Sequence, residues 1–162
     1  MQQSNKWYKL IAVYQILNAA LFILGTLSKI RLGFIEAASI TLLLALLANG
    51  YCLYAGIRLW QQQTKHTVYA QTLQLIGVTV AGATYKFASG LFWQLGIEWN
   101  QSFQAIFAFD WSSFLILSYS PASKIKFSLV VNLVPLLIIW YLTKRADKTQ
   151  YQKTTLTSSS SL

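Results

Sequence analysis

Charged and reactive residues are scarce in this chain. Only 10% of its 162 residues are charged, against about 25% in an ordinary soluble domain. One cysteine, Cys52, and one histidine, His66, are present, so an internal disulfide is excluded. Hydrophobic residues make up 55% of the chain, which excludes an ordinary water-soluble globule. The length suits one domain.

The usual signs of an active site are also missing. The four acidic residues are scattered, so no carboxylate pair suggests acid–base catalysis. No Gly-rich phosphate loop or nucleophile elbow occurs, and one histidine cannot give bis-histidine haem ligation. No metal-ligand spacing surrounds Cys52. We therefore expect no enzymatic activity, no cofactor and no metal site.

Apolar blocks separated by short basic segments dominate the chain. They cover residues 10–28, 35–57, 66–84 and 127–142. Because blocks of about 20 apolar residues match the hydrocarbon thickness of a bilayer, the sequence predicts an all-α bundle of four transmembrane helices. Pro135 is expected to kink the last helix. The polar tail 146–162 is expected to be disordered.

The net charge of +9 is carried mostly at the ends of these blocks. Eight Lys and Arg residues fall on the side of the two termini and five on the other. The positive-inside rule then predicts a multi-pass protein of the plasma (inner) membrane with both termini in the cytoplasm. Basic residues at such positions are typical of contacts with lipid headgroups, so we expect no nucleic-acid partner.

The segment between the last two blocks, about residues 85–123, has a different pattern. From Leu91 to Trp111 almost every second residue is apolar, which is the period of a β-strand. With turns at Asn100–Gln101 and Ser112–Ser113, the pattern predicts a small extracytoplasmic antiparallel β-meander between the third and fourth helices. An amphipathic helix and a re-entrant segment are the alternatives. The predicted strands are Leu91–Trp99, Ser102–Trp111 and Ser113–Ser120.

One face of the predicted meander is aromatic. It carries Trp93, Trp99, Phe103, Phe107, Phe109 and Trp111. Three strands alone are only marginally stable, so this face needs a cover. Its own helices, the bilayer interface and a partner protein are the alternatives. We expect an accessory membrane protein that uses this face for docking or capping, with the bilayer and another membrane protein or a second copy as partners.

The polar residues inside the predicted helices are mostly amides. They are Gln15, Asn18, Asn49, Gln71, Gln74 and Asn132. Such a set indicates hydrogen bonds between helices, or a polar path through a small transporter or channel. A further alternative is a lipid-acting membrane enzyme that uses Glu36, Lys86, Glu98 and Asp110.

Two short stretches resemble those of a set of small bacterial four-helix inner-membrane proteins. They are AGIRLW at Ala55–Trp60 and YKFASG at Tyr85–Gly90. In that set a short basic loop joins the second and third helices, and a Phe- and Ser-rich extracytoplasmic segment precedes the last helix. The resemblance implies a bacterial inner-membrane location. It carries over no activity and no functional residue.

Overall fold

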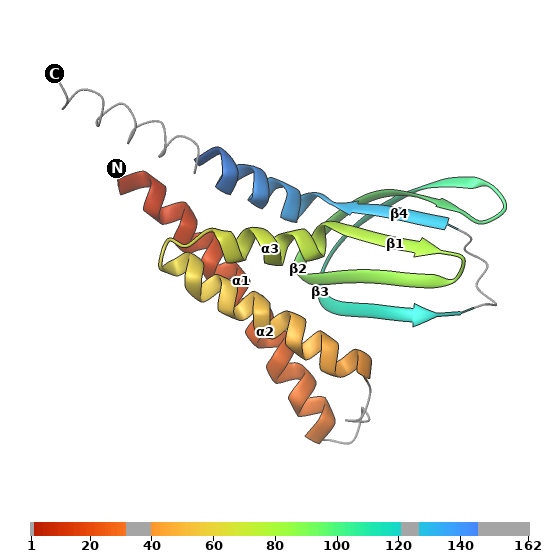
Figure 1. Ribbon diagram of the computed structural model, residues 1–162, viewed down its shortest axis with the longest axis horizontal. Helices are drawn as coiled ribbons and strands as arrows, with labels where there is room; N and C mark the ends of the chain where they lie inside the picture. Colours follow the sequence, from red (N-terminus) through yellow and green to blue (C-terminus); the bar gives the residue numbers. More distant parts are fainter. Residues whose placement is uncertain (1, 32–39, 121–126, 146–162) are drawn as a thin grey trace.

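Helices gather at one end of the molecule and an antiparallel sheet at the other (Figure 1). The computed structural model describes residues 2–31, 40–120 and 127–145. Its elements, in chain order, are α1 (Gln2–Arg31), α2 (Ile40–Trp60), α3 (Lys65–Leu75), β1 (Ile76–Val80), β2 (Ala83–Trp99), β3 (Phe103–Tyr119) and β4 (Phe127–Asn132). A further helix covers residues 133–145.

The prediction of an all-α bundle of four transmembrane helices is wrong. The chain has an α/β fold with a four-stranded antiparallel sheet. Among the described helices, two are long and apolar enough to cross a membrane, Lys6–Ser28 and Ile40–Trp60. The tail 146–162 and the start of the second predicted helix, residues 35–39, lie outside the described residues.

Two of the four predicted helices change their structure midway. The block at 66–84 begins as α3 but continues as β1, and the block at 127–142 begins as β4 and continues as a helix. The strand portions, IGVTV and FSLVVN, contain β-branched residues and a phenylalanine, which favour strands. A hydropathy pattern does not distinguish a short apolar strand from half of an apolar helix.

Pro135 does not kink its helix, contrary to the sequence prediction. The helix begins at residue 133, so Pro135 lies in its first turn, where a backbone N–H has no intrahelical partner to lose. The side chain of Asn132 caps the same turn, because its Oδ1 accepts the N–H of Val134 at 3.2 Å. This cap sets the point at which β4 becomes a helix.

Small residues bring α1 and α2 close together. Ala12, Ala19 and Ala55 are fully buried, and a Cβ added at Gly56 would lie 2.8 Å from Ile16 Cγ1. Such residues let two helices approach closely without a water-excluding core of large side chains. The outward face of α1 is apolar, with exposed Leu10, Leu17, Leu21 and Leu24.

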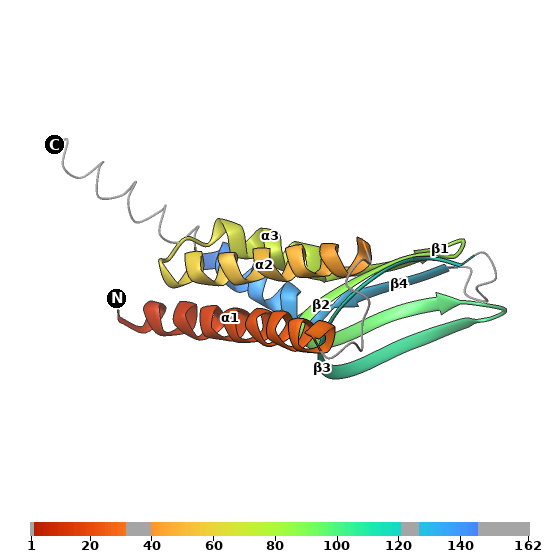
Figure 2. The same cartoon turned by 90° about the horizontal axis from the view of Figure 1, so that it is seen from below.

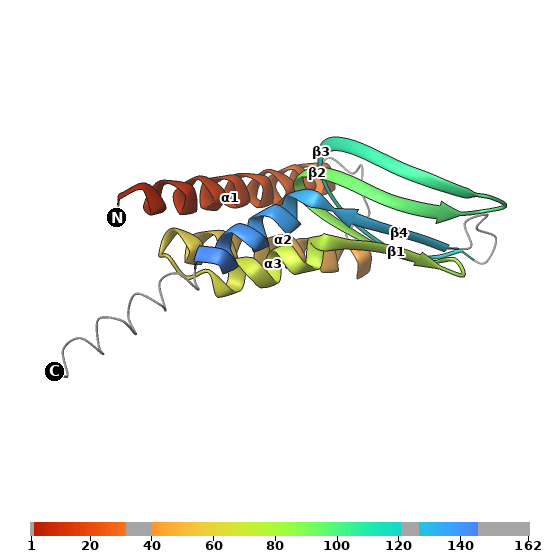
Figure 3. The ribbon, with the colours of Figure 1, turned by 90° about the horizontal axis from the view of Figure 1, so that it is seen from above.

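The hairpin of β2 and β3 is long and folded back on itself. The two strands pair continuously from Ala83↔Tyr119 to Trp99↔Phe103. β1 pairs with the start of β2, β4 pairs with its end, and β1 and β4 pair with each other. One strand borders both neighbours only if it bends between them, and Figures 1 and 3 show both limbs of the hairpin extending away from the helices.

Two of the three strands predicted for the meander are confirmed as antiparallel parts of β2 and β3, with the turn at Asn100–Gln101. The separate third strand is wrong. Ser112 and Ser113 lie inside β3, opposite Gly90 and Ser89, where the hairpin bends. The unpredicted turn is Ala81–Gly82 between β1 and β2, where φ is 48° and 88°, as in the type I′ turns of tight hairpins.

Candidate functional site at the bend of the hairpin

The bend of β2 leaves part of a strand without a strand neighbour on one side. β1 reaches as far as Tyr85 and β4 begins at Gln94, so residues 86–93 have a strand only on the β3 side. The bend itself is at Gly90, whose φ is +104°, a conformation that side chains other than hydrogen disfavour. The N–H and C=O groups on the open side need other partners.

Tyr14 of α1 provides the first of these partners. Its hydroxyl accepts the N–H of Leu91 at 2.9 Å and donates to the C=O of Leu91 at 3.2 Å. One hydroxyl thus replaces the two bonds that a neighbouring strand would make. Tyr14 lies near the middle of α1, and in Figure 2 the bend of the hairpin lies at the side of the sheet that faces the helices.

Gln74 at the end of α3 provides the second partner. Its Oε1 accepts the N–H of Ser89 at 2.9 Å, while its Nε2 donates to the carbonyl of Ala70. The hydroxyl of Ser89 donates to Oδ1 of Asn49 in α2 at 2.9 Å. The bend is therefore bonded to three helices as well as to its own hairpin, through Tyr14, Asn49 and Gln74.

Asn132 provides the third partner, from the end of β4. Its Oδ1 accepts the N–H of Trp93 at 3.1 Å as well as the N–H of Val134. A single carbonyl oxygen therefore joins the hairpin to the start of the last helix. Asn132 is only 3% exposed. Shortening its side chain would therefore leave the N–H groups of Trp93 and Val134 without an acceptor in a region that water does not reach.

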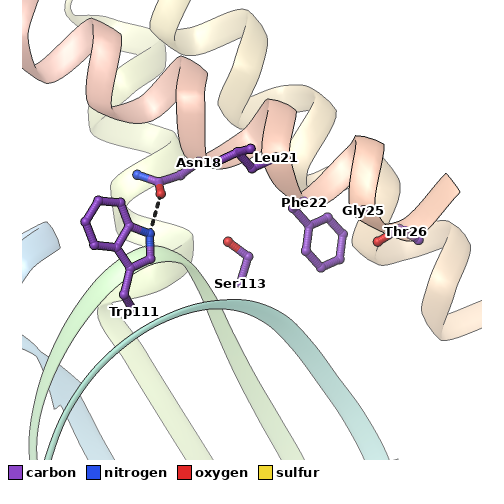
Figure 4. A pocket seen from close by; sticks show the side chains of 7 residues that line it. All are labelled: Asn18, Leu21, Phe22, Gly25, Thr26, Trp111 and Ser113. Atoms are coloured by element: carbon purple, nitrogen blue, oxygen red, sulfur yellow. Dashed lines mark hydrogen bonds between the residues drawn. The ribbon is translucent and has the colours of Figure 1, made fainter. Parts of the chain in front are cut away.

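Asn18 joins α1 to β3 beside a pocket of about 330 Å³ (Figure 4). Its Oδ1 accepts the indole N–H of Trp111 at 2.7 Å, and its Nδ2 donates to the carbonyl of Tyr14. The pocket lies between α1 and the bend, and it is lined by Asn18, Leu21, Phe22, Gly25, Thr26, Trp111 and Ser113. Apart from the two β3 residues, Trp111 and Ser113, its wall is one face of α1.

Only glycine fits at position 90. A Cβ there would lie 2.5 Å from Nδ2 of Asn18 and 2.8 Å from the Tyr14 hydroxyl oxygen. Tyr14, Ser89 and Gly90 are not among the residues that the sequence predicts to matter. An isolated glycine inside an alternating strand is the signal that indicates the bend.

The predicted amide cluster is partly assembled at this bend. The sequence predicts that these amides make bonds between helices or line a polar path. Instead, hydrogen bonds to the hairpin are made by Asn18, Asn49, Gln74 and Asn132. Gln71 is buried. Gln15 is 3% exposed, and both polar atoms of its side chain lack a hydrogen-bond partner among the described residues.

The six aromatic residues of the predicted surface all lie on one face of the hairpin, which we call the aromatic face. The register pairs them across the strands or with an apolar residue: Leu91↔Trp111, Trp93↔Phe109, Leu95↔Phe107 and Trp99↔Phe103. Trp93 and Trp99 are 38% and 43% exposed, and the other four are between 65% and 72% exposed. Large apolar side chains this exposed in a single chain mark a contact surface.

On the opposite face of the sheet, polar side chains of β1 and β4 are covered, whereas Gln104 and Asp110 of β3 are exposed. Thr79 and Ser128 are 3% and 0% exposed, and the hydroxyls of Thr79 and Thr84 are 3.2 Å apart. The buried hydroxyl of Ser128 has no partner within the described ranges. A sheet that faces water on one side normally buries its apolar face, whereas here the aromatic face is exposed.

Basic side chains lie over aromatic rings near the helix ends that are far from the sheet. The first turns of α1 and α3 and the last turns of α2 and helix 133–145 meet there (Figure 1). Each cation lies over a ring in the pairs Lys9–Trp60, Arg58–Tyr54, Lys65–Tyr69, Lys144–Trp140 and Arg145–Tyr141, with 4.7–5.9 Å to the ring centroid. We call this set the basic aromatic belt.

The groups considered for a lipid-acting enzyme are spread along the hairpin. Lys86 lies opposite Ile116, Glu98 opposite Gln104, and Asp110 opposite Phe92. The carboxylate of Asp110 accepts the N–H of Trp111 at 2.6 Å. Glu36 lies outside the described residues. No cluster of metal-ligating side chains is found in the part searched, residues 2–31, 40–120 and 127–145.

Comparison with protein families, curated proteins and solved structures finds no significant match. The resemblance to small inner-membrane proteins stays a prediction, and their four-helix architecture is not the one that this chain adopts.

Proposed function

We propose that this chain is an integral membrane interaction protein. In this proposal α1 and α2 hold it in the bilayer, and the aromatic face docks it in a membrane assembly. The observation that carries the proposal is the exposure of the aromatic face, whose six side chains are between 38% and 72% exposed. Each aromatic side chain can bury about 150–250 Å² at a contact, and tryptophan and tyrosine often dominate binding energy at interfaces.

The basic aromatic belt supports one orientation in the membrane. Trp and Tyr are enriched at the two membrane interfaces, and Lys and Arg on the cytoplasmic side. With the belt at the cytoplasmic interface, the N-terminus of α1 and the end of helix 133–145 are cytoplasmic, and the sheet faces the extracytoplasmic side. Anionic lipid headgroups would be the natural neighbours of the belt.

The hydrogen bonds at the bend favour this proposal over a transport path. Of the six predicted amides, Asn18, Asn49, Gln74 and Asn132 are bonded to side-chain or backbone groups of the hairpin. Groups that hold a strand in place are not free to exchange bonds with a passing solute. A lipid-acting enzyme needs convergent groups, and no ion pair joins Lys86 to Glu98 or Asp110 in the described part.

The mass of the complex tests the proposal. The wild-type protein is extracted from its native membranes in mild detergent, and the protein mass is measured by light scattering with the detergent subtracted. We expect a mass above the 18.3 kDa of one chain. Phe107→Ser with Phe109→Ser, on the aromatic face, should reduce it to one chain. A wild-type mass of one chain would contradict the proposal.

The matched control is Gln104→Ser with Ala108→Ser, on the other face of the same strand. It adds the same hydroxyls at neighbouring positions and should leave the complex intact. Equal loss in both double variants would mean that the complex depends on the stability of the hairpin and not on the aromatic face.

A further inference from the structure

One strand forms both edges of the sheet. In the part of the chain that the structure describes, β3 pairs only with β2. Because the hairpin is folded back, the order across the sheet is residues 113–119, residues 83–89, β1, β4, residues 91–99 and residues 103–111. Residues 103–111 and 113–119 of the same strand are therefore the two outer edges.

The direction of the backbone groups at these edges follows from Tyr14. Both the N–H and the C=O of Leu91 bond to Tyr14, so Leu91 and Trp111 are a non-hydrogen-bonded pair of the ladder. Pairs alternate in an antiparallel ladder, so Trp111, Phe109, Phe107 and Ala105 direct their N–H and C=O groups away from β2. The Trp111 N–H is covered by the carboxylate of Asp110.

Between Phe103 and Phe109 the first edge lacks the charges and prolines that usually prevent strand pairing. From Phe103 to Phe109 the sequence is FQAIFAF, with no charge and no proline. Proteins usually protect an edge strand with lysine, proline, a bulge or a covering segment. An unpaired backbone N–H or C=O group is strongly unfavourable in an apolar environment, and the side chains beside these groups belong to the exposed aromatic face.

We propose that the two edges pair with each other between copies of this chain, residues 103–111 of one copy against residues 113–119 of the next. The two edge segments run in opposite directions (Figure 1), so copies in the same orientation meet as antiparallel strands. Repeated around an axis along the strands, this pairing closes the curved sheets into a ring with no free edge. It rests on the proposed function and names the partner as a second copy.

The membrane orientation favours pairing of the two unlike edges over pairing of one edge with the same edge of another copy. An edge that paired with its own copy in antiparallel fashion would need a two-fold axis perpendicular to the strands. That axis would point one chain toward each side of the bilayer. Since α1 and α2 would give every copy the same orientation, the pairing of unlike edges is the antiparallel pairing that is compatible with the membrane.

Disulfide cross-linking between single-cysteine variants tests the pairing. In a Cys52→Ala background, Phe107→Cys on one edge is co-expressed with a differently tagged Leu115→Cys, Leu117→Cys or Tyr119→Cys on the other. Positions 107 and 117 are equally far from the bend at Ser112. Positions 115 and 119 allow for a shift in register between the two strands. Opposed residues have Cβ atoms about 4.5–5.5 Å apart, close to disulfide reach.

We expect mild oxidation in native membranes to join Phe107→Cys to at least one of the three partners. A chain that carries Phe107→Cys together with that partner cysteine should form a series of cross-linked oligomers. Phe107→Cys alone should not dimerise, and Gln104→Cys, whose side chain lies on the other face, should not join any of the three. Absence of all three cross-links, or cross-linking of Phe107→Cys only to itself, would overturn the proposal.

A charge on the edge gives an independent measurement without cysteines. Ala105→Lys should reduce the detergent-extracted complex to the mass of one chain, because a lysine on the edge opposes strand pairing. If the wild-type complex exceeds one chain but no cross-link forms, the partner is another protein and only this inference fails. If the wild type has the mass of one chain, the proposed function fails as well.

Discussion

The hydroxyl of Tyr14 bonds to both backbone groups of Leu91, accepting its N–H at 2.9 Å and donating to its C=O at 3.2 Å. The two residues are 77 positions apart in the sequence. A side chain of an apolar helix thus completes a strand that no other strand borders at that point. Together with Gln74 and Asn132, it allows the hairpin to fold back without leaving buried amides unbonded.

Removal of the Tyr14 hydroxyl should destabilise the protein. Tyr14→Phe leaves the N–H and C=O of Leu91 without these bonds, and an unsatisfied buried group costs about 1–3 kcal/mol. Thermal unfolding in detergent, followed by circular dichroism, measures the loss. The control is Tyr119→Phe, because that side chain is 72% exposed. Equal stability of the two variants would contradict the role of Tyr14.

Gly90 and Gly50 should respond in opposite directions to alanine. Gly90→Ala is strained by a φ of +104° and by the close approach of Asn18, so we expect it to lower the free energy of unfolding by about 1–3 kcal/mol. Gly50 lies inside α2 with nothing within 4 Å of an added Cβ. Gly50→Ala should raise stability by about 0.5–1 kcal/mol. Destabilisation of the same size in both would contradict the bend.

Asn132 should show a graded response. Asn132→Ser retains a cap for Val134 but is too short to keep the N–H of Trp93 bonded, and Asn132→Ala removes both acceptors. We expect the order of stability wild type, serine, alanine, with a total loss of about 1–3 kcal/mol. Chemical denaturation in detergent gives this order. A serine variant as unstable as the alanine variant would show that capping contributes nothing.

Cys52 should be inert in the folded protein. Its side chain is fully buried between α2 and its neighbours, with Sγ 3.5 Å from Nε2 of Gln74. A neutral thiol reagent should label it only after unfolding, so the rate of labelling reports on the stability of the helix end of the molecule. Stoichiometric labelling of the native protein within minutes would contradict this packing.

The sequence predicts the hairpin well because its period of two reflects one apolar and one polar face, from Leu91 to Trp111. It fails at 66–84 and 127–142, where helix and strand are equally apolar and only local β-branched residues favour the strand. It names the amides but not their role, because the groups that they bond lie in another part of the chain. Tyr14 carries no local signal at all, whereas Gly90 does.

Spin labels on β3 test whether the aromatic face lies in an apolar environment. In a Cys52→Ala background the label is placed at position 103, 107 or 109 on this face, or at position 104 or 108 on the other face, and the protein is reconstituted in lipid vesicles. We predict that a water-soluble nickel chelate collides much less often with labels at Phe103, Phe107 and Phe109 than with the label at Gln104. Frequent collisions with oxygen at these positions would identify lipid as the neighbour, and rare ones a protein. If the chelate reaches Phe107 and Phe109 as readily as Gln104, the aromatic face is in water and the account is wrong.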